Sequence, residues 1–209
     1  MHSRRLITVA WTGASGARYG LRLVHALLVL QQRVDLLISD AARLVLRQEC
    51  DLSLQGDGAV VVHALGHYFH AQGQPVDLSG LRHFAKDDWL APMASGGAGS
   101  RSMVVCPCSM GTLAAIAHGL SDNLIERAAD VIIKEGRPLI LVPRETPFSV
   151  IHLENMLSLA RLGVTVLPAA PGFYHRPERL DDVLDFIVAR ILDHLGIAHT
   201  FAPVWPPKG

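Results

Sequence analysis

The chain has 209 residues, 50% of them hydrophobic and only 18% charged, which favours a globular protein with a large core over a disordered one. Nineteen basic and nineteen acidic residues cancel to a formal net charge of zero. Because the basic residues are scattered rather than clustered, we expect no nucleic-acid partner. The length favours one domain over 1–209, with 196–209 as a C-terminal tail.

Hydropathy and cysteine content favour a cytoplasmic protein that assembles from identical subunits. The apolar run after Arg5 is too short for a signal peptide, and no segment approaches the roughly 20 apolar residues of a membrane-spanning helix. We therefore expect a cytoplasmic protein without membrane insertion. The mean hydropathy of +0.29 favours apolar surface covered by identical subunits. Cys50, Cys106 and Cys108 do not form a C-x-x-C pair, so we expect buried thiols in a reducing compartment.

Hydrophobic patterns predict the elements of the first half of the chain. A strand over 6–11 precedes a helix with apolar positions at Tyr19, Leu23, Leu27 and Leu30. A second strand over 34–39 leads to a helix that Ser39-Asp40 caps and that runs to about Glu49. Residues 51–100 are less regular, and we expect short strands and loops there.

The second half alternates in the same way. Strands are predicted over 103–106, 138–142 and 164–167, and helices over 109–118, from a cap at Asp122 through Val131, over 149–161 and over 180–195. Strands that alternate with helices indicate an α/β fold, Rossmann-like or flavodoxin-like, with a mostly parallel sheet covered by helices on both faces.

The turn after the first strand reads Thr12-Gly13-Ala14-Ser15-Gly16-Ala17. Such a strand–turn–helix connection directs backbone N–H groups and the positive end of a helix dipole outward, which suits a phosphate or another anion. The turn lacks the third glycine of G-x-G-x-x-G, so by itself it is equally compatible with a plain connection.

Polar side chains follow every predicted strand. In open α/β sheets, ligands bind outside the carboxyl ends of the strands. There the chain places Ser15, Ser39, Ser109 with Thr112, Arg144-Glu145 and the segment from Pro168 to Tyr174. Together these groups predict a site for a phosphate-bearing ligand.

The same residues carry a family resemblance. The segments T-G-A-S-G-A, P-C-S-M-G-T-L-A, D-N-L-I-E-R-A-A-D-V-I-I-K-E, L-V-P-R-E-T-P and P-G-F-Y-H-R-P, in order over about residues 6–195, resemble the UbiX-type flavin prenyltransferases. The resemblance implies transfer of a dimethylallyl group from dimethylallyl phosphate to reduced FMN. The prenylated FMN would serve UbiD-type decarboxylases, with a place in ubiquinone biosynthesis. It also implies a metal-independent enzyme assembled as a dodecamer with sites at subunit contacts.

The resemblance also assigns roles to residues. It places FMN on ten positions: Gly13, Ala14, Ser15, Ser39, Ser109, Met110, Gly111, Thr112, Arg127 and Arg144. It places the prenyl phosphate on six: Ser95, Gly96, Lys134, Glu145, Tyr174 and Arg190. Where the family often reads S-G-S, this chain reads Ser95-Gly96-Gly97 and lacks one hydroxyl.

The chemistry of the implied reaction suggests three catalytic groups. Cleaving an allylic C–O bond leaves negative charge on the phosphate, which Lys134, Arg190 and the Tyr174 hydroxyl can balance. Glu145 is the candidate for protonating that phosphate, and Ser15 and Glu49 are the candidates for proton transfer at the flavin. Trp89 and Trp205 are candidates for walls of the prenyl pocket, with ordinary packing as the alternative.

Other functions remain open at the level of sequence. His63, His67 and His70 form the densest histidine group, but Gly66 argues against a firm helix between them, so we expect surface or packing histidines and no metal site. A flavin-dependent decarboxylase of the cysteine-decarboxylase kind and an FMN carrier are the two alternative functions. Assays with a cysteine-bearing substrate and mass analysis of the flavin distinguish them from a prenyltransferase.

Overall fold

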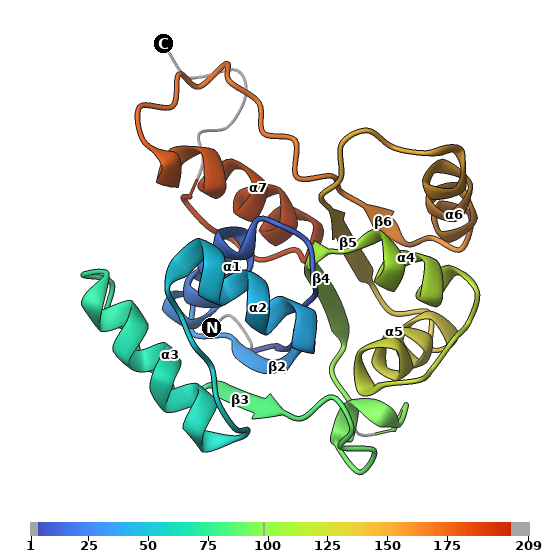
Figure 1. Ribbon diagram of the computed structural model, residues 1–209, viewed down its shortest axis with the longest axis horizontal. Helices are drawn as coiled ribbons and strands as arrows, with labels where there is room; N and C mark the ends of the chain where they lie inside the picture. The colour runs from blue at the N-terminus through green and yellow to red at the C-terminus, as the bar shows by residue number, and fades with distance from the viewer. Residues whose placement is uncertain (1–3, 98, 202–209) are drawn as a thin grey trace.

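A computed structural model describes residues 4–97 and 99–201. At its centre the described strands form one parallel sheet in the order β3-β2-β1-β4-β5-β6 (Figure 1). The strands are β1 (Leu6–Trp11), β2 (Arg33–Ile38), β3 (Leu81–Phe84), β4 (Ser102–Cys108), β5 (Leu139–Pro143) and β6 (Thr165–Val166). The chain builds one half of the sheet outward from β1 and the other outward from β4, so the strand order reverses between these two neighbours.

Helices cover both faces of the sheet. The α-helices are α1 (Ala17–Val29), α2 (Asp40–Cys50), α3 (Ala59–Ala71), α4 (Met110–Ala117), α5 (Leu124–Lys134), α6 (Val150–Arg161) and α7 (Leu180–His194), and η1 (Pro92–Ala94) is a short 3-10 helix. Residues of α1, α2, α3 and α7 share one buried cluster with Val9 and Leu36. Residues of α4, α5 and α6 share the other with Ala10 and Leu37. Successive residues of a strand therefore point into the two cores on opposite faces of the sheet. The predicted fold class is confirmed.

The prediction of short strands and loops over 51–100 is wrong for α3. Gly66 lies inside this helix, where a Cβ atom would approach Leu78 Cδ1 to 2.6 Å. The glycine therefore makes room for a packed leucine instead of ending a helix. Val61, Leu65 and Phe69 bury the inner side of α3 against the first core, and this tertiary packing offsets the weak local propensity.

Smaller differences concern boundaries. Asn123, and not Asp122, caps α5, because its side chain accepts hydrogen bonds from the N–H groups of Ile125 and Glu126. Strand β4 continues through Pro107 to Cys108, and β6 has only two residues. After α7 the chain forms no further strand within the described residues, although Ile197 is buried and Phe201 packs on the first core.

The sequence also predicted buried thiols and no membrane-spanning helix. All three cysteines are free, with Cys106 and Cys108 buried and Cys50 half-buried. Burial raises the pKa of the Cys108 thiol to about 12, so this group is inert as a nucleophile at neutral pH. None of the helices in the described part of the chain has the length and apolar content needed to cross a bilayer.

Candidate functional site

Four turns meet at the carboxyl edge of the sheet, where the strand order reverses between β1 and β4. Ligands of doubly wound sheets bind at this position because the connecting helices leave in opposite directions and open a crevice. The turns after β1, β2, β4 and β5 carry Ser15, Ser39, Ser109 and Arg144. The structure therefore brings together the polar residues that the sequence placed at these strand ends.

Thr12 joins the two central turns. Its hydroxyl donates to the carbonyl of Pro107 at 3.0 Å and accepts from the N–H of Ser109 at 2.7 Å. The side chain is buried, so these bonds are shielded from water. No role for Thr12 was expected from the sequence, although a threonine directly after the first buried strand was an available signal.

Glu49 occupies the N-terminus of α1. Its carboxylate accepts hydrogen bonds from Gly16 N at 2.9 Å and from Ala17 N at 2.8 Å. Gly16 has a φ of +104°, a conformation that glycine adopts without strain. The anion that the turn was expected to attract is thus supplied by the chain itself, and an external phosphate would have to displace it.

The electrostatics of Glu49 keep it ionised. Burial alone would raise the pKa of Glu49, but hydrogen bonds from Ser15 and from the N–H groups of Ala17 and Gly16, together with the charge of Arg144, bring it below its ordinary value. At neutral pH this carboxylate is therefore ionised and accepts hydrogen bonds beside Ser15.

Arg144 closes the site from the β5 side. Its Nε donates to the carbonyl of Ser15 at 3.1 Å, and its backbone N–H donates to the carbonyl of Cys108 at 3.4 Å. This places one guanidinium beside the turns after β1 and β4. A guanidinium in this position can pair with an anionic or carbonyl-bearing ligand.

The N-terminus of α4 is the anion site that remains. Ser109 caps this helix, with its hydroxyl accepting from Thr112 N at 3.3 Å and donating to Thr112 Oγ1 at 3.0 Å. A Cβ atom at Gly111 would meet nothing within 4 Å, so the first turn is open to a ligand. On the other side, Ser39 caps α2, and Gly13 packs directly against Ala41 of its first turn.

This donor set fits FMN. A flavin phosphate and ribityl chain need hydroxyl donors, free N–H groups and a cation, and Ser39, Ser109, Thr112, Arg144 and the first turn of α4 supply them. The exposed Gly13 allows the backbone to approach a ring.

Two of the predicted prenyl-phosphate residues follow neighbouring strands at the same edge. Glu145 comes directly after Arg144, and the chain after β6 returns beside β5 through the bond from Ala169 N to Pro143 O. In that segment the Tyr174 ring makes an edge contact with Phe186, with centroids 5.7 Å apart. Phe186 also stacks on His175.

Ser95, Gly96 and Arg127 form a separate group on the face covered by α5. Arg127 Nε donates to the carbonyl of Ala94 at 3.0 Å, and Arg137 Nη2 donates to the carbonyl of Gly96 at 2.7 Å. A Cβ atom at Gly96 would require the Glu135 side chain to move. The two arginines thus fix the Ser95–Gly96 loop, and Arg137 is a residue that sequence reasoning missed because no motif surrounds it.

Within one protomer, Lys134 and Arg190 do not lie at the carboxyl edge of the sheet. Lys134 ends α5, four residues before Pro138, whose carbonyl pairs with the first residues of β4 at the opposite edge. Arg190 lies in the second half of α7 and pairs with Asp193 at 2.7 Å. Trp89 is half-exposed in the loop before η1. Trp205 lies outside the described residues.

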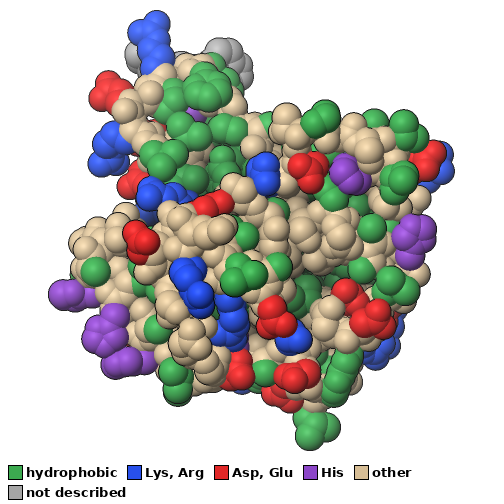
Figure 2. Space-filling model, in the orientation of Figure 1, with side chains coloured by type: hydrophobic (Ala, Val, Ile, Leu, Met, Phe, Trp, Pro, Cys, Tyr) green, Lys and Arg blue, Asp and Glu red, His purple; other side chains and the backbone are tan. Residues whose placement is uncertain are grey.

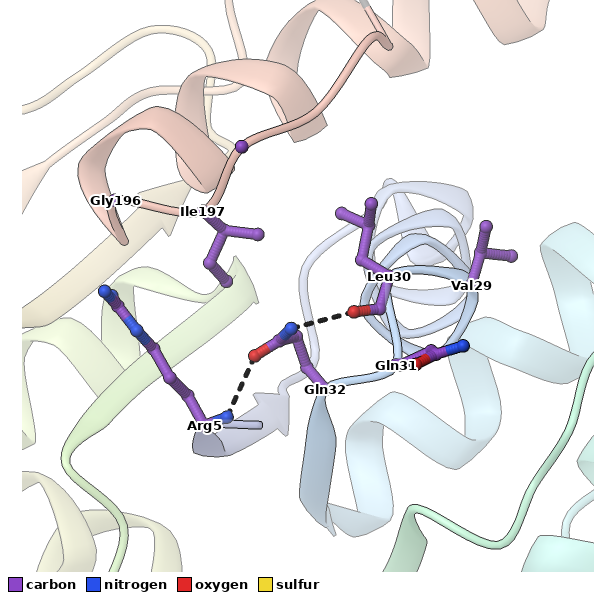
Figure 3. Close-up of a pocket in the computed structure, with 8 residues that line it drawn as sticks. Arg5, Val29, Leu30, Gln31, Gln32, Gly196 and Ile197 are labelled. Atoms are coloured by element: carbon purple, nitrogen blue, oxygen red, sulfur yellow. Dashed lines mark hydrogen bonds between the residues drawn. The ribbon is translucent and has the colours of Figure 1, made fainter. Parts of the chain in front are cut away.

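A cavity of about 360 Å³ lies elsewhere, at the ends of α1 and α7 (Figure 3). The Gln32 side chain in its wall is already paired at both ends: Arg5 N donates to Gln32 Oε1 at 3.0 Å, and Gln32 Nε2 donates to Leu30 O at 2.8 Å, as the dashed lines in Figure 3 show. These bonds hold the cavity walls together, so its lining offers less ligand chemistry than the turns at the carboxyl edge.

Many α/β proteins bind a phosphate at this edge of the sheet, and similarity to known proteins identifies the family of this chain. The model of the Flavoprotein family matches residues 1–192. The flavin prenyltransferase UbiX of Pseudomonas aeruginosa is 54% identical over 200 residues, which cover 95% of this chain and 93% of that protein. The chain belongs to the UbiX-type flavin prenyltransferases. It is an enzyme of the transferase class, and its flavin is FMN.

Solved structures of this family agree with the fold. The crystal structure of AnUbiX (PadA1) in complex with FMN and dimethylallyl pyrophosphate has a TM-score of 0.84 and 37% identity, over 99% of this chain and 100% of that one. A dodecameric FMN-dependent UbiX-like decarboxylase from Escherichia coli O157:H7 has a TM-score of 0.83 and 38% identity, over 98% and 100% of the two chains. The similarity extends over the whole sheet and both helical layers.

Proposed function

We propose that this flavin prenyltransferase transfers a dimethylallyl group from dimethylallyl phosphate to N5 and C6 of reduced FMN and supplies the product to a UbiD-type decarboxylase. The observation that carries the proposal is the meeting of Glu49, Ser15, Arg144 and the open N-terminus of α4 at one edge of the sheet. The free thiols favour a reducing compartment, and we place the enzyme in the cytoplasm.

The flavin half of the site binds and exchanges protons. Reduced FMN, when bound, supplies the nucleophilic N5 and C6 atoms. Ser109, Thr112 and Ser39 hold its phosphate and ribityl chain, while Arg144 lies beside the Ser15 turn. Ser15, hydrogen-bonded to the ionised Glu49, is positioned to pass a proton to that carboxylate during ring closure.

The donor half of the site stabilises the leaving phosphate. Cleavage of the C–O bond moves an electron pair onto the phosphate oxygen, and Glu145 donates the proton that neutralises it. Tyr174 donates a hydrogen bond, and Lys134 and Arg190 balance the remaining charge. A monophosphate carries little enough charge for these side chains to serve in place of a magnesium ion.

Lys134 and Arg190 reach that phosphate only if another subunit presents them, because neither lies at the edge of its own protomer. We therefore propose a homo-dodecamer like that of the E. coli relative, with sites completed between subunits. The exposed apolar side of α6 provides contact surface for such an assembly.

The test is the mass of the flavin after incubation of the purified protein with reduced FMN and either dimethylallyl phosphate or the diphosphate. We expect a flavin heavier by one dimethylallyl group, formed faster from the monophosphate. Recovery of unmodified FMN with both donors would contradict prenyl transfer and favour an FMN carrier. Turnover of a cysteine-bearing peptide instead would identify a decarboxylase.

A further inference from the structure

Three histidines lie along one exposed side of α3. His63, His67 and His70 are spaced by four and three residues, so they occupy a single stripe of the helix. All three are exposed, whereas Val61, Leu65 and Phe69 bury the opposite side. Figure 2 shows histidine side chains gathered over this helix at the left of the molecule. The stripe lies outside the turns that form the flavin site.

Two of these histidines already meet. The Nε2 atoms of His63 and His67 are 2.8 Å apart, and their rings are nearly perpendicular with centroids separated by 4.3 Å. A hydrogen bond at this distance requires one ring to donate from Nε2 and the other to accept there. Both Nε2 atoms therefore point toward the same small volume of space.

That separation matches two adjacent ligands of one metal ion. Imidazole nitrogens lie about 2.0–2.1 Å from a bound transition metal, so two of them at a 90° angle are about 2.9 Å apart, and at a tetrahedral angle about 3.4 Å apart. The observed 2.8 Å is close to the right-angle value. Square-planar and octahedral ions such as Cu²⁺ and Ni²⁺ fit with little movement, and tetrahedral Zn²⁺ requires the rings to separate.

The surroundings favour a preformed pair. Helix α3 contains no Asp, Glu, Lys or Arg, so no neighbouring side chain on the helix competes for the imidazoles or repels a cation. Leu78 packs into the notch at Gly66, between the two histidines in sequence, and fixes the helix that carries them. No group of three His, Cys, Asp or Glu ligands occurs in the described residues, so water completes the coordination.

We propose that His63 and His67 form a binding site for a divalent transition-metal ion, with Cu²⁺ and Ni²⁺ preferred over Zn²⁺. The ion takes the place of the proton between the two Nε2 atoms. The ring that donated this proton then carries it on Nδ1, so both ligands bind as neutral imidazoles. The expectation of no metal site rested on a broken helix at Gly66, and α3 is continuous there.

The experiment uses the full chain without an affinity tag, freed of metal by a chelator and titrated with Cu²⁺, Ni²⁺ and Zn²⁺ by calorimetry. We expect His63→Gln and His67→Gln each to weaken Cu²⁺ and Ni²⁺ binding at least tenfold. His70→Gln is the matched control on the same stripe and should change affinity less than about twofold. Electron paramagnetic resonance of the Cu²⁺ complex should show two equatorial nitrogen ligands in the wild type and one in either variant.

Unchanged Cu²⁺ affinity in His63→Gln and His67→Gln would overturn the proposal, and so would an equal loss in His70→Gln. Zn²⁺ binding tighter than Ni²⁺ binding would contradict the geometric argument. FMN binding by each variant shows that the fold is intact. The proposal is independent of the prenyl-transfer reaction, which none of these substitutions should alter.

Discussion

Glu49 is the residue that most changes the interpretation of the site. It lies in the last turn of α2, where the helix dipole disfavours a negative charge. The structure offsets this cost by placing the carboxylate on the N-terminus of α1, 32 residues away in sequence. An acidic residue at a helix C-terminus is a detectable signal, but its partner becomes known only in three dimensions.

The first prediction concerns Glu49→Gln. The amide keeps the shape and one acceptor oxygen, but it loses the charge that attracts the α1 N-terminus and the capacity to accept a proton from Ser15. We expect prenyl transfer to fall by about two orders of magnitude and the free energy of unfolding to fall by about 1 kcal/mol at neutral pH. Single-turnover formation of prenylated FMN and urea unfolding measure the two effects.

The same substitution should alter the pH dependence of stability. Because the folded-state pKa of Glu49 is depressed, its contribution is present above the unfolded value of 4.5 and is lost as pH falls through the lower folded value. The stability difference between wild type and Glu49→Gln should therefore shrink below about pH 4.5. A difference that grows on acidification would contradict the assignment of Glu49 as an ionised acceptor.

Sequence patterns predicted the helices and strands whose formation depends on local signals, such as a capping residue or an apolar run. Ser39 caps its helix as predicted, and Ser109 and Ser149 cap the helices that were predicted to start at these residues. The apolar runs that form β1, β2, β4 and β5 were also recognisable in the sequence. Helix α3 escaped prediction because it begins at a glycine without a side-chain cap and depends on contacts with β3 and Leu78. The Ser95–Gly96 loop is fixed by two arginines, one in α5 and one after it, whose bonds span 33 and 41 residues of the chain.

His83 provides a test of how α3 is held. It is buried in β3, and its Nδ1 accepts a hydrogen bond from the N–H of Gly58, the N-cap residue that precedes α3. Burial, followed by the nearby Arg43, lowers the pKa of His83 from 6.5 to about 4. The unfolded chain therefore binds a proton that the folded protein does not between these two values, and stability falls as pH falls through this window.

His83→Gln retains an acceptor for Gly58 but does not titrate. We expect the wild type to lose up to about 3 kcal/mol between pH 6.5 and pH 4 from this group, and the variant to show a flatter profile. Urea midpoints at fixed protein concentration measure both. Parallel profiles for the two proteins would show that His83 is not responsible for the acid sensitivity.

Gly20 tests the packing that positions the flavin turn. It lies in α1, where a Cβ atom would come within 2.6 Å of both the Cys106 carbonyl and Trp11 Nε1. An alanine in a helix normally gains about 1 kcal/mol over glycine, but here it would push α1 away from β4. We expect Gly20→Ala to destabilise the protein by about 2 kcal/mol and to weaken FMN binding. Gly97→Ala, where a Cβ would meet nothing and the backbone does not have the left-handed conformation, serves as a steric control for equilibrium unfolding and flavin titration.

Within one protomer, the turns that would bind the flavin lie together at the carboxyl edge of the sheet, whereas the proposed site for the prenyl donor is incomplete. The convergence of the turns after β1, β4 and β5 follows from parallel-sheet topology, which a sequence pattern predicts. The positions of Lys134 and Arg190 follow from no such rule, because both lie within helices and away from that edge. In the proposed function, an assembly of several chains brings them to the phosphate of the donor.

Helix α6 is where that assembly can be tested. Val150 is 70% exposed, Ile151 68%, Leu153 52% and Leu157 51%, more apolar surface than one helix of a monomer normally presents to water. The double variant Leu153→Glu/Leu157→Glu places charge on this surface without touching the core. We expect light scattering to show a species smaller than the proposed dodecamer, with FMN binding retained and prenyl transfer reduced at least tenfold because the neighbouring cations are lost. Gln72→Glu, an exposed change at the end of α3, controls for added charge, and a double variant that remains dodecameric and active would exclude α6 from the interface.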